Sequence, residues 1–516
     1  MNFFDKYQWY LFLFILFIAA FIRFFNFPEI PAGFNQDEAA IAYDSYSIMH
    51  YGIDRNGYHF PVYPISWGAG QGPFYMYFAI PFMWLFGSTV FGFRIGNVIL
   101  SIVSVISIFF AMKNSFSTRE GIIAMFLFAI SPWNIILSRW ALDANPLPSL
   151  FIISFCCLTY AINTRRTLFY LLAAGLFAVS LYTYGTSYVV IPLFLLLTIP
   201  YLLLHKKITW QQTLLSGIVF VAGTFPLILF ILVNYLGLGE INTPLFSVPK
   251  LTALRSDAIF RHFTDDPLHQ LKDSLSSYFT FVIGQKVIHP WNGIRQFGIL
   301  YPFSSLFIIA GIAIALINVK FKTFHYHYLY CAMFFSCSVL TLLIHPNVNR
   351  IHIVYVPVIC LAAAAIAHLS KTSKLIFHTV ITVYLISFLS FCHYYIHDYN
   401  EQFMDAAFYE SYEEAIQFAD AEAEGTIYVS SSIGSAYIRT LFHVKTDPYT
   451  FIDTVQYYDD TAAFRQAYSF GCYIFALPES ITPDAYYVIS NEEIAAFDPA
   501  LFSFETFQYF TVAYPH

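Results

Sequence analysis

Long runs of hydrophobic residues, separated by short polar segments, fill the first three quarters of the chain. A helix that crosses about 30 Å of hydrocarbon needs roughly 20 mostly apolar residues. These runs therefore predict a polytopic α-helical membrane protein with about eleven transmembrane helices. The candidate spans are 8–26, 89–112, 120–138, 147–162, 167–184, 187–204, 212–236, 302–319, 327–345, 351–369 and 373–396.

A shorter apolar segment, 73–87, precedes the second candidate span. It contains Pro73 and Pro81 and ends at Gly87. Its length favours an interfacial or re-entrant helix, and a full crossing is the alternative.

The pattern changes after residue 396, where long apolar runs give way to short mixed elements. Helical periodicity is expected at 408–424, 435–443 and 461–468, and short β-rich runs stand at 426–430, 472–476, 485–489 and 502–513. The expected domains are therefore a transmembrane domain, 1–396, and a small α/β domain, 397–516. The transmembrane domain includes a first outer loop at 27–88 and a large outer loop at 237–301.

Composition supports this division. Hydrophobic residues make up 58% of the chain and charged residues only 11%, and the mean hydropathy is +0.60. These values exclude an ordinary soluble enzyme, a disordered chain and a nucleic-acid-binding protein. Residues 397–516 hold 19 of the 32 acidic residues but only three of the 25 basic ones, so the acidic charge is concentrated in the tail.

Basic residues indicate the orientation, since they accumulate in short cytoplasmic loops. If the N-terminus is cytoplasmic, every second loop is short and basic, while the long segments and the tail lie outside the cytoplasm. The basic loop residues are Lys6, Lys113, Arg119, Arg165, Arg166, Lys206, Lys207, Lys320, Lys322, Lys371 and Lys374. The sequence thus predicts a multi-pass cell-membrane protein with an extracytoplasmic C-terminal domain.

The first outer loop carries an acidic pair, Asp37-Glu38, at the start of an Ala-rich helix. Carboxylates stabilise the positive N-terminus of a helix, and this is one interpretation of the pair. The other is chemical, because a carboxylate pair beside the first span could act as a general base or bind a divalent metal ion.

The ionisable residues of the transmembrane domain, including this pair, lie mostly at the outer ends of the predicted spans. They are Asp37, Glu38, Arg94, Arg139, Asp143, Arg350 and His352. An ion-coupled transporter is expected to hold a carboxylate near mid-depth. A polymerase of lipid-linked polysaccharide would share the topology but should lack the early acidic pair. The pattern therefore favours a reaction site at the outer surface, with a non-enzymatic transporter or a polymerase as the alternative.

The ordered motifs of residues 1–396 resemble the GT-C superfamily of glycosyltransferases. The resemblance is to the branch of protein O-mannosyltransferases and the lipid A aminoarabinose transferase. The matching features are Asp37-Glu38, the turn Gly52–Gly57, Pro61, Pro73-Phe74-Tyr75, Phe86-Gly87, Arg94, Ser131-Pro132-Trp133, Ser138–Asp143 and Asn349–His352 with Pro357.

This resemblance implies inverting transfer of a sugar from a polyprenyl-phosphate donor to a hydroxyl of a glycan, lipid or protein acceptor. Asp37 would be the general base, and Glu38 would orient the acceptor or a metal ion. Two features depart from relatives. Gln71-Gly72-Pro73 stands where several have Lys-Pro-Pro, and the acidic tail does not support protein O-mannosylation.

The remaining candidates each have a second interpretation. Arg94, Arg139 and Arg350 could bind the lipid phosphate or simply extend toward water at span ends. Asp143 could bind sugar or acceptor, or pair with Arg139 four residues earlier. Trp291 could stack on a sugar or anchor the interface, and His352 could contact substrate or metal or be a satisfied interfacial residue.

Overall fold

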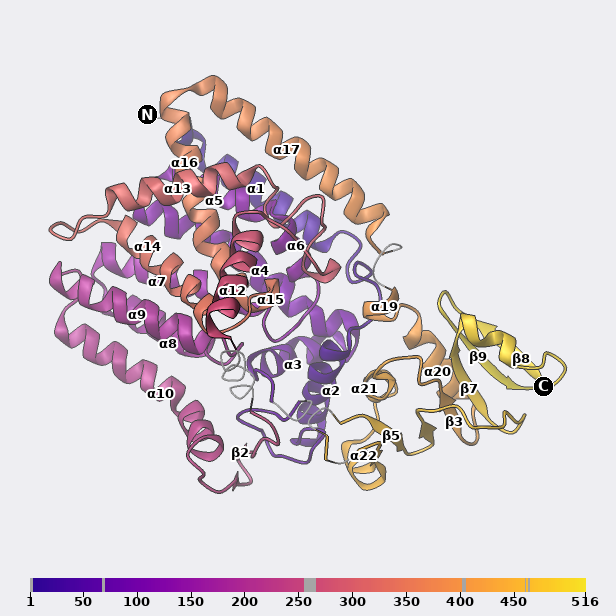
Figure 1. Ribbon diagram of the computed structural model, residues 1–516. Coiled ribbons are helices and arrows are strands. Elements are labelled where there is room, and N and C mark those ends of the chain that lie inside the picture. The colour runs from indigo at the N-terminus through magenta and orange to yellow at the C-terminus, as the bar shows by residue number, and fades with distance from the viewer. Residues whose placement is uncertain (1–2, 67–69, 255–265, 401–404, 460, 463–464) are drawn as a thin grey trace. The chain divides into compact units, whose positions relative to one another are not determined.

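The computed structural model describes residues 3–66, 70–254, 266–400, 405–459, 461–462 and 465–516 (Figure 1). Its contacts divide the chain into two units. The helical unit comprises residues 1–27, 97–226 and 255–396, and the mixed unit comprises 28–96, 227–254 and 397–516. Residues 28–96 of the first outer loop are thus grouped with the C-terminal residues, whereas the sequence assigned 27–88 to a transmembrane domain ending at 396.

Apolar helices joined by short turns make up the helical unit (Figure 1). Helices α4 (Val90–Ser115) and α10 (Trp210–Asn234) also contribute residues to the mixed unit, as does His397 at the end of α17 (Lys374–His397). The others are α1 (Phe3–Phe24), α5 (Thr118–Ala129), α6 (Pro132–Ser138), α7 (Pro146–Thr164), α8 (Thr167–Ser180), α9 (Ser187–Leu204), α12 (Pro267–Val282), α13 (Ser304–Asn318), α14 (Tyr326–Ser338), α15 (Val348–Ile351) and α16 (Tyr355–Thr372), with short 3₁₀ turns at Pro290–Asn292, Val339–Leu342 and His352–Val354.

Seven helices within the described residues are long and apolar enough to cross a membrane. An eighth span results if α5 and α6, which meet at an angle of 61°, are one broken crossing. Shorter apolar helices stand at 167–180, 304–318 and 326–342. The chain is therefore a multi-pass helical membrane protein, as expected, and the number eleven stays a prediction.

Burial separates the core helices from the periphery of this unit. The segment Val348–Thr372 is 78% buried, whereas the most apolar windows of α10 and α17 are only 22% and 17% buried. Helix α16 packs against α5 and α13. The contact with α13 is so close that a Cβ on Gly311 would lie 2.1 Å from the carbonyl oxygen of Leu361, so glycine is required there.

The mixed unit contains α2 (Gln36–Tyr51), α3 (Phe74–Phe86) and a seven-stranded sheet of order β4-β5-β6-β3-β7-β9-β8. Strands β6, β3 and β7 are parallel, and the outer pairs are antiparallel. A small hairpin, β1 and β2, is separate from this sheet. The remaining bounds are β1 (Ile241–Asn242), β2 (Ser247–Val248), α19 (Asp405–Phe408), α20 (Tyr412–Glu422), β3 (Ile427–Val429), α21 (Ala436–His443), α22 (Pro448–Thr454), β4 (Gln456–Tyr457), β5 (Ala467–Phe470), β6 (Tyr473–Ile474), β7 (Tyr486–Ser490), the 3₁₀ turn Asn491–Ala496, β8 (Phe502–Thr506) and β9 (Phe510–Pro515).

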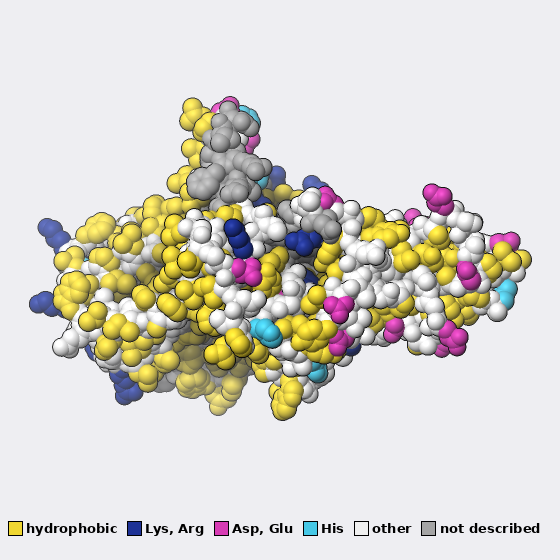
Figure 2. All heavy atoms as spheres, turned by 90° about the horizontal axis from the view of Figure 1, so that it is seen from below, with side chains coloured by type: hydrophobic (Ala, Val, Ile, Leu, Met, Phe, Trp, Pro, Cys, Tyr) yellow, Lys and Arg dark blue, Asp and Glu magenta, His cyan; other side chains and the backbone are white. Residues whose placement is uncertain are grey.

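The expected elements of the tail are largely present, with two corrections. The helix expected at 461–468 is wrong, because Ala467 and Tyr468 begin strand β5 and no helix forms in the described part of that segment. The helix expected at 408–424 is divided into α19 and α20, since Tyr409 and Ser411 take positive φ angles of 55° and 65°. Figure 2 shows acidic side chains concentrated over the part that carries the sheet.

Candidate active site

The acidic pair of the first outer loop begins α2. Asn35 caps the helix, and its side-chain oxygen accepts a hydrogen bond from the Asp37 backbone N–H at 2.9 Å. Glu38 completes a capping box by accepting from the Asn35 N–H at 3.4 Å. Asp37 itself is half-buried, whereas Glu38 is fully buried. The two neighbouring carboxylates therefore occupy different environments.

Glu38 is held by Arg94 in a two-point ion pair. The Arg94 Nε and Nη2 atoms donate to the two carboxylate oxygens at 2.9 and 2.7 Å, and both side chains are 0% exposed. The other guanidinium hydrogens go to the backbone carbonyls of Pro28, Pro31 and Gly33. Five acceptors thus match the five donors of Arg94, which fixes both Glu38 and the loop before α2.

That loop also packs against C-terminal residues of the mixed unit. The Phe34 N–H donates to the carbonyl oxygen of Phe408 at 2.5 Å. Gly33 has a φ of +75°, and a Cβ there would lie 2.3 Å from the same oxygen. A side chain at position 33 would therefore push the loop away from α19.

A second buried charge cluster stabilises the turn Gly52–Gly57, which follows α2. Arg55 pairs with Asp44 at 3.2 Å, and both are nearly inaccessible. Asp54 forms the turn by accepting from the backbone N–H groups of Asn56 and Tyr58 at 2.9 Å each. Burial, reinforced by the Asp44 charge, raises the pKa of Asp54 to about 7. The cluster stabilises the loop rather than facing solvent.

Arg139 stands at the end of α6 in the helical unit, where it is 1% exposed. Its guanidinium donates to the carbonyl oxygens of Ile22, Arg23 and Asn26 at 2.8 to 3.0 Å. These carbonyls lie at the C-terminal end of α1, where a positive charge is favoured. Arg139 therefore caps α1.

The segment between α6 and α7 contains Asp143, which is 3% exposed. Asn97 fixes this segment by donating to the carbonyl oxygens of Leu137 and Trp140, each at 2.8 Å. The Trp140 indole N–H donates to the Trp291 carbonyl at 3.1 Å. The second outer loop and the Trp291 segment, whose bonded residues are 151 positions apart in sequence, are thus side by side within this unit.

The two candidates near residue 350 differ in accessibility. Arg350 is exposed, and its Nη1 donates to the His345 carbonyl at 3.1 Å. His352 is fully buried, with its ring centroid 6.3 Å from that of Trp133 on α6. The Arg350 guanidinium is therefore accessible to a ligand, whereas the His352 ring packs inside the helical unit.

Three of the eight candidates, Asp37, Glu38 and Arg94, thus lie together in the mixed unit. The other five are in the helical unit: Arg139, Asp143, Trp291, Arg350 and His352. In the part of the chain that the structure describes, no three His, Cys, Asp or Glu side chains are grouped as metal ligands.

Sequence reasoning missed Arg23, which is buried and donates to Ser101, Asn134 and the carbonyls of Ala19 and Ala129. The interruption of an apolar run by one arginine was its only signal in the sequence.

A family model described as dolichyl-phosphate-mannose-protein mannosyltransferase matches residues 70–235. No curated protein sequence matches the chain. Among solved structures, ArnT from Cupriavidus metallidurans bound to undecaprenyl phosphate superposes with a TM-score of 0.59 at 12% identity. The match covers 98% of each chain.

The fold of the chain is therefore that of ArnT, a GT-C fold. The archaeal oligosaccharyltransferase AglB from Archaeoglobus fulgidus, in complex with an inhibitory peptide and dolichol phosphate, is a further match. Its TM-score is 0.50 at 14% identity, covering 86% of this chain and 64% of AglB. The resemblance noted from the Asp37-Glu38 loop is confirmed at the level of fold, and the match to ArnT covers the C-terminal residues of this chain as well.

Proposed function

We propose that this GT-C protein is a membrane glycosyltransferase that uses a sugar linked to a polyprenyl phosphate. The observation that carries the proposal is the GT-C fold along almost the whole chain, combined with the two environments of the acidic pair in its first outer loop. The acceptor would be a hydroxyl of a glycan, lipid or protein on the outer face of the membrane.

Asp37 is the proposed general base. In the reaction the acceptor oxygen attacks C1 of the sugar, and the bond between C1 and the phosphate oxygen breaks. Asp37 takes the acceptor proton, so the products are a glycosylated acceptor with inverted configuration and polyprenyl phosphate. The half-buried position of Asp37 supports this role, because Glu38 is fully buried and engaged by Arg94.

Glu38 and Arg94 are then positioning residues. Their ion pair and the Arg94 contacts to three loop carbonyls keep the start of α2 in place. Arg139 is a positioning residue as well, because its guanidinium donates to carbonyl oxygens at the end of α1. Arg350, with an exposed guanidinium, is the proposed contact for the donor phosphate, since arginine matches phosphate oxygens with paired donors.

Asp143 and Trp291 are proposed to bind sugar or acceptor. The bond between Trp140 and the Trp291 carbonyl supports a common role for their two segments. A divalent metal ion at Asp37 is a further option, in which the ion would neutralise charge on the leaving phosphate. Glu38 is a weaker candidate ligand because both of its oxygens accept from Arg94.

An in vitro transfer assay tests the function. Purified protein is incubated with a panel of polyprenyl-phosphate sugars and membrane extracts as acceptors, and products are identified by mass. We expect the wild type to release polyprenyl phosphate from at least one donor and Asp37→Asn to lose at least a thousandfold in rate.

Glu29→Gln is the matched control, since Glu29 is an exposed carboxylate of the same loop and should leave the rate unchanged. If the Asp37→Asn variant released polyprenyl phosphate at the rate of the wild type, the assignment of Asp37 as general base would be refuted. The absence of turnover with every donor, in protein that binds polyprenyl phosphate, would instead favour transport of lipid-linked saccharides. The proposed extracytoplasmic side of the tail is tested with a reporter that is active only in the cytoplasm, fused after His516. This fusion should be inactive.

A further inference from the structure

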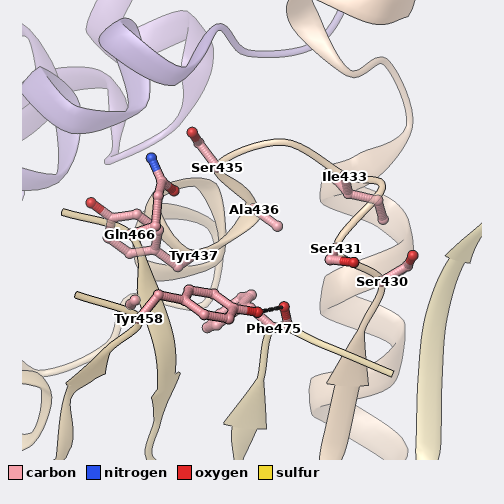
Figure 3. A pocket seen from close by; sticks show the side chains of 10 residues that line it. Ser430, Ser431, Ile433, Ser435, Ala436, Tyr437, Tyr458, Gln466 and Phe475 are labelled. Carbon is pink, nitrogen blue, oxygen red and sulfur yellow. Dashed lines mark hydrogen bonds between the residues drawn. The ribbon is translucent and has the colours of Figure 1, made fainter. Parts of the chain in front are cut away.

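The C-terminal sheet has a cavity at the carboxyl ends of two neighbouring parallel strands (Figure 3). Ser430 directly follows β3, and Phe475 directly follows β6. The chain passes from β3 to β6 on one side of β3 and then to β7 on its other side, so strand order reverses at β3. In open α/β sheets, ligands bind in the crevice outside the carboxyl ends of the strands at such a reversal.

The cavity has a volume of about 320 Å³, at the lower end of the range typical of small-molecule sites. Its apolar wall is formed by Ile433, Ala436, Ala467 and Phe475, and its aromatic groups are Tyr437 and Tyr458. Four polar side chains complete the lining: Ser430, Ser431, Ser435 and Gln466. Figure 3 shows these groups around one opening, from the ends of the strands to the start of α21.

Tyr458 is the most distinctive member of this lining. Its hydroxyl donates to the Phe475 carbonyl at 2.7 Å, which fixes the ring at one end. The side chain nevertheless remains 55% exposed, although Tyr437 beside it is 5% exposed. A fixed, exposed aromatic face offers contact area at little cost in conformational entropy, and it suits the C–H face of a sugar ring.

The neutral lining of the cavity favours an uncharged ligand. The ten described lining residues include none with an ionised side chain at pH 7. Just behind them, the Glu493 carboxylate accepts hydrogen bonds from the hydroxyls of Ser430 at 2.6 Å and Ser432 at 3.0 Å. The tail as a whole has 19 acidic and three basic residues, an excess of negative charge that disfavours a phosphate or carboxylate. Arg55 and Arg465 act on Tyr437 at the cavity wall, so the uncharged character of the ligand rests on the neutral lining.

We propose that this cavity binds an uncharged saccharide, with a sugar ring on Tyr458 and its hydroxyls bonded to the Ser431, Ser435 and Gln466 side chains. The aromatic face, the hydroxyl and amide groups and the excess of negative charge together define this ligand class. The saccharide is part of the acceptor, an assignment that rests on the proposed glycosyltransferase function. The binding itself does not depend on transfer.

The test is a binding titration with the full-length protein. The protein is purified in a detergent without a sugar headgroup and titrated with maltotriose, mannotriose and chitotriose by saturation-transfer NMR. We expect at least one of them to bind the wild type and Tyr458→Ala to weaken that binding at least tenfold. Tyr458→Phe keeps the ring but loses the bond to the Phe475 carbonyl, so it should weaken binding less than Tyr458→Ala does.

Tyr449→Ala is the matched control, because Tyr449 lies on α22 outside the cavity and is 51% exposed. Failure of all three saccharides to bind would overturn the proposal, as would unchanged affinity in Tyr458→Ala. Tighter binding of a trisaccharide containing glucuronic acid would overturn its uncharged character. Asp37→Asn should bind the saccharide and not transfer to it, which separates a failure of this site from a failure of the proposed function.

Discussion

Replacing Glu38 and Asp37 one at a time should separate a structural carboxylate from a chemical one. Glu38→Gln keeps the shape of the side chain and removes the negative charge that faces Arg94. Asp37→Asn makes the same chemical change one residue earlier, where the side chain is half-buried. We expect the Glu38 variant to lose stability and activity together, and the Asp37 variant to lose activity alone.

The structure sets the size of the effect. Both Arg94 bonds to Glu38 are charge-assisted, at 2.9 and 2.7 Å, and neither side chain is accessible to water. Breaking a buried pair by neutralising one partner costs about 3–5 kcal/mol, because the remaining charge stays buried. In domains of 150–250 residues this corresponds to a decrease in Tm of roughly 10 °C.

Thermal unfolding at a fixed scan rate and single-turnover transfer provide the two measurements. The double variant Glu38→Gln with Arg94→Gln leaves no uncompensated charge, but it also removes the Arg94 bonds to three loop carbonyls, so its Tm should remain below that of the wild type. A Glu38→Gln protein with the Tm of the wild type would refute the structural role of the pair. An Asp37→Asn protein with a Tm 10 °C lower would refute the distinction between the two carboxylates.

Three further changes test other parts of the structure. The raised pKa of Asp54, about 7, means that this carboxyl stabilises the folded state at low pH and that the stabilisation is lost as pH rises. The free energy of unfolding should therefore fall by about 1.4 kcal/mol between pH 6 and pH 8 from Asp54 alone. Asp54→Asn should remove this component, as measured by chemical denaturation. Gly311→Ala should lower stability by about 1–3 kcal/mol through its collision with Leu361, whereas Gly217→Ala, which has open space, should not; equal Tm values would contradict the close contact. Arg350→Ala should raise the KM for the lipid-linked donor about tenfold with little change in Tm, and an unchanged KM would exclude Arg350 from phosphate binding.

Much of the organisation was accessible from sequence because apolar length and periodicity are local properties. Each run that predicted a span contains an apolar helix, and the short β-rich runs of the tail became strands β3, β6 and β7. At 467–468 strand β5 replaces the expected helix, because pairing with β4 and β6 overrides the local helical preference there.

The site was predictable only in part. Asp37-Glu38 was recognisable as the start of a helix and as a motif, since both depend on neighbouring residues. The separation of their roles was not, because the Arg94 partner of Glu38 is 56 residues away in sequence. The same holds for Arg139, whose position at a span end suggested phosphate binding while its acceptors are carbonyls of α1.

The sequence by itself determined that this chain is a membrane protein with an acidic tail and a pair of carboxylates after its first span. These properties follow from hydrophobicity and charge, which act along the chain. Only the tertiary structure decided which charged side chains are buried against partners in the protein, as Glu38 is by Arg94, and which are exposed, as Arg350 is. It also placed Tyr458, Ser431 and Gln466 around one cavity. Hydrogen-bond partners and cavities depend on the folding of distant segments against each other, and no local pattern records that.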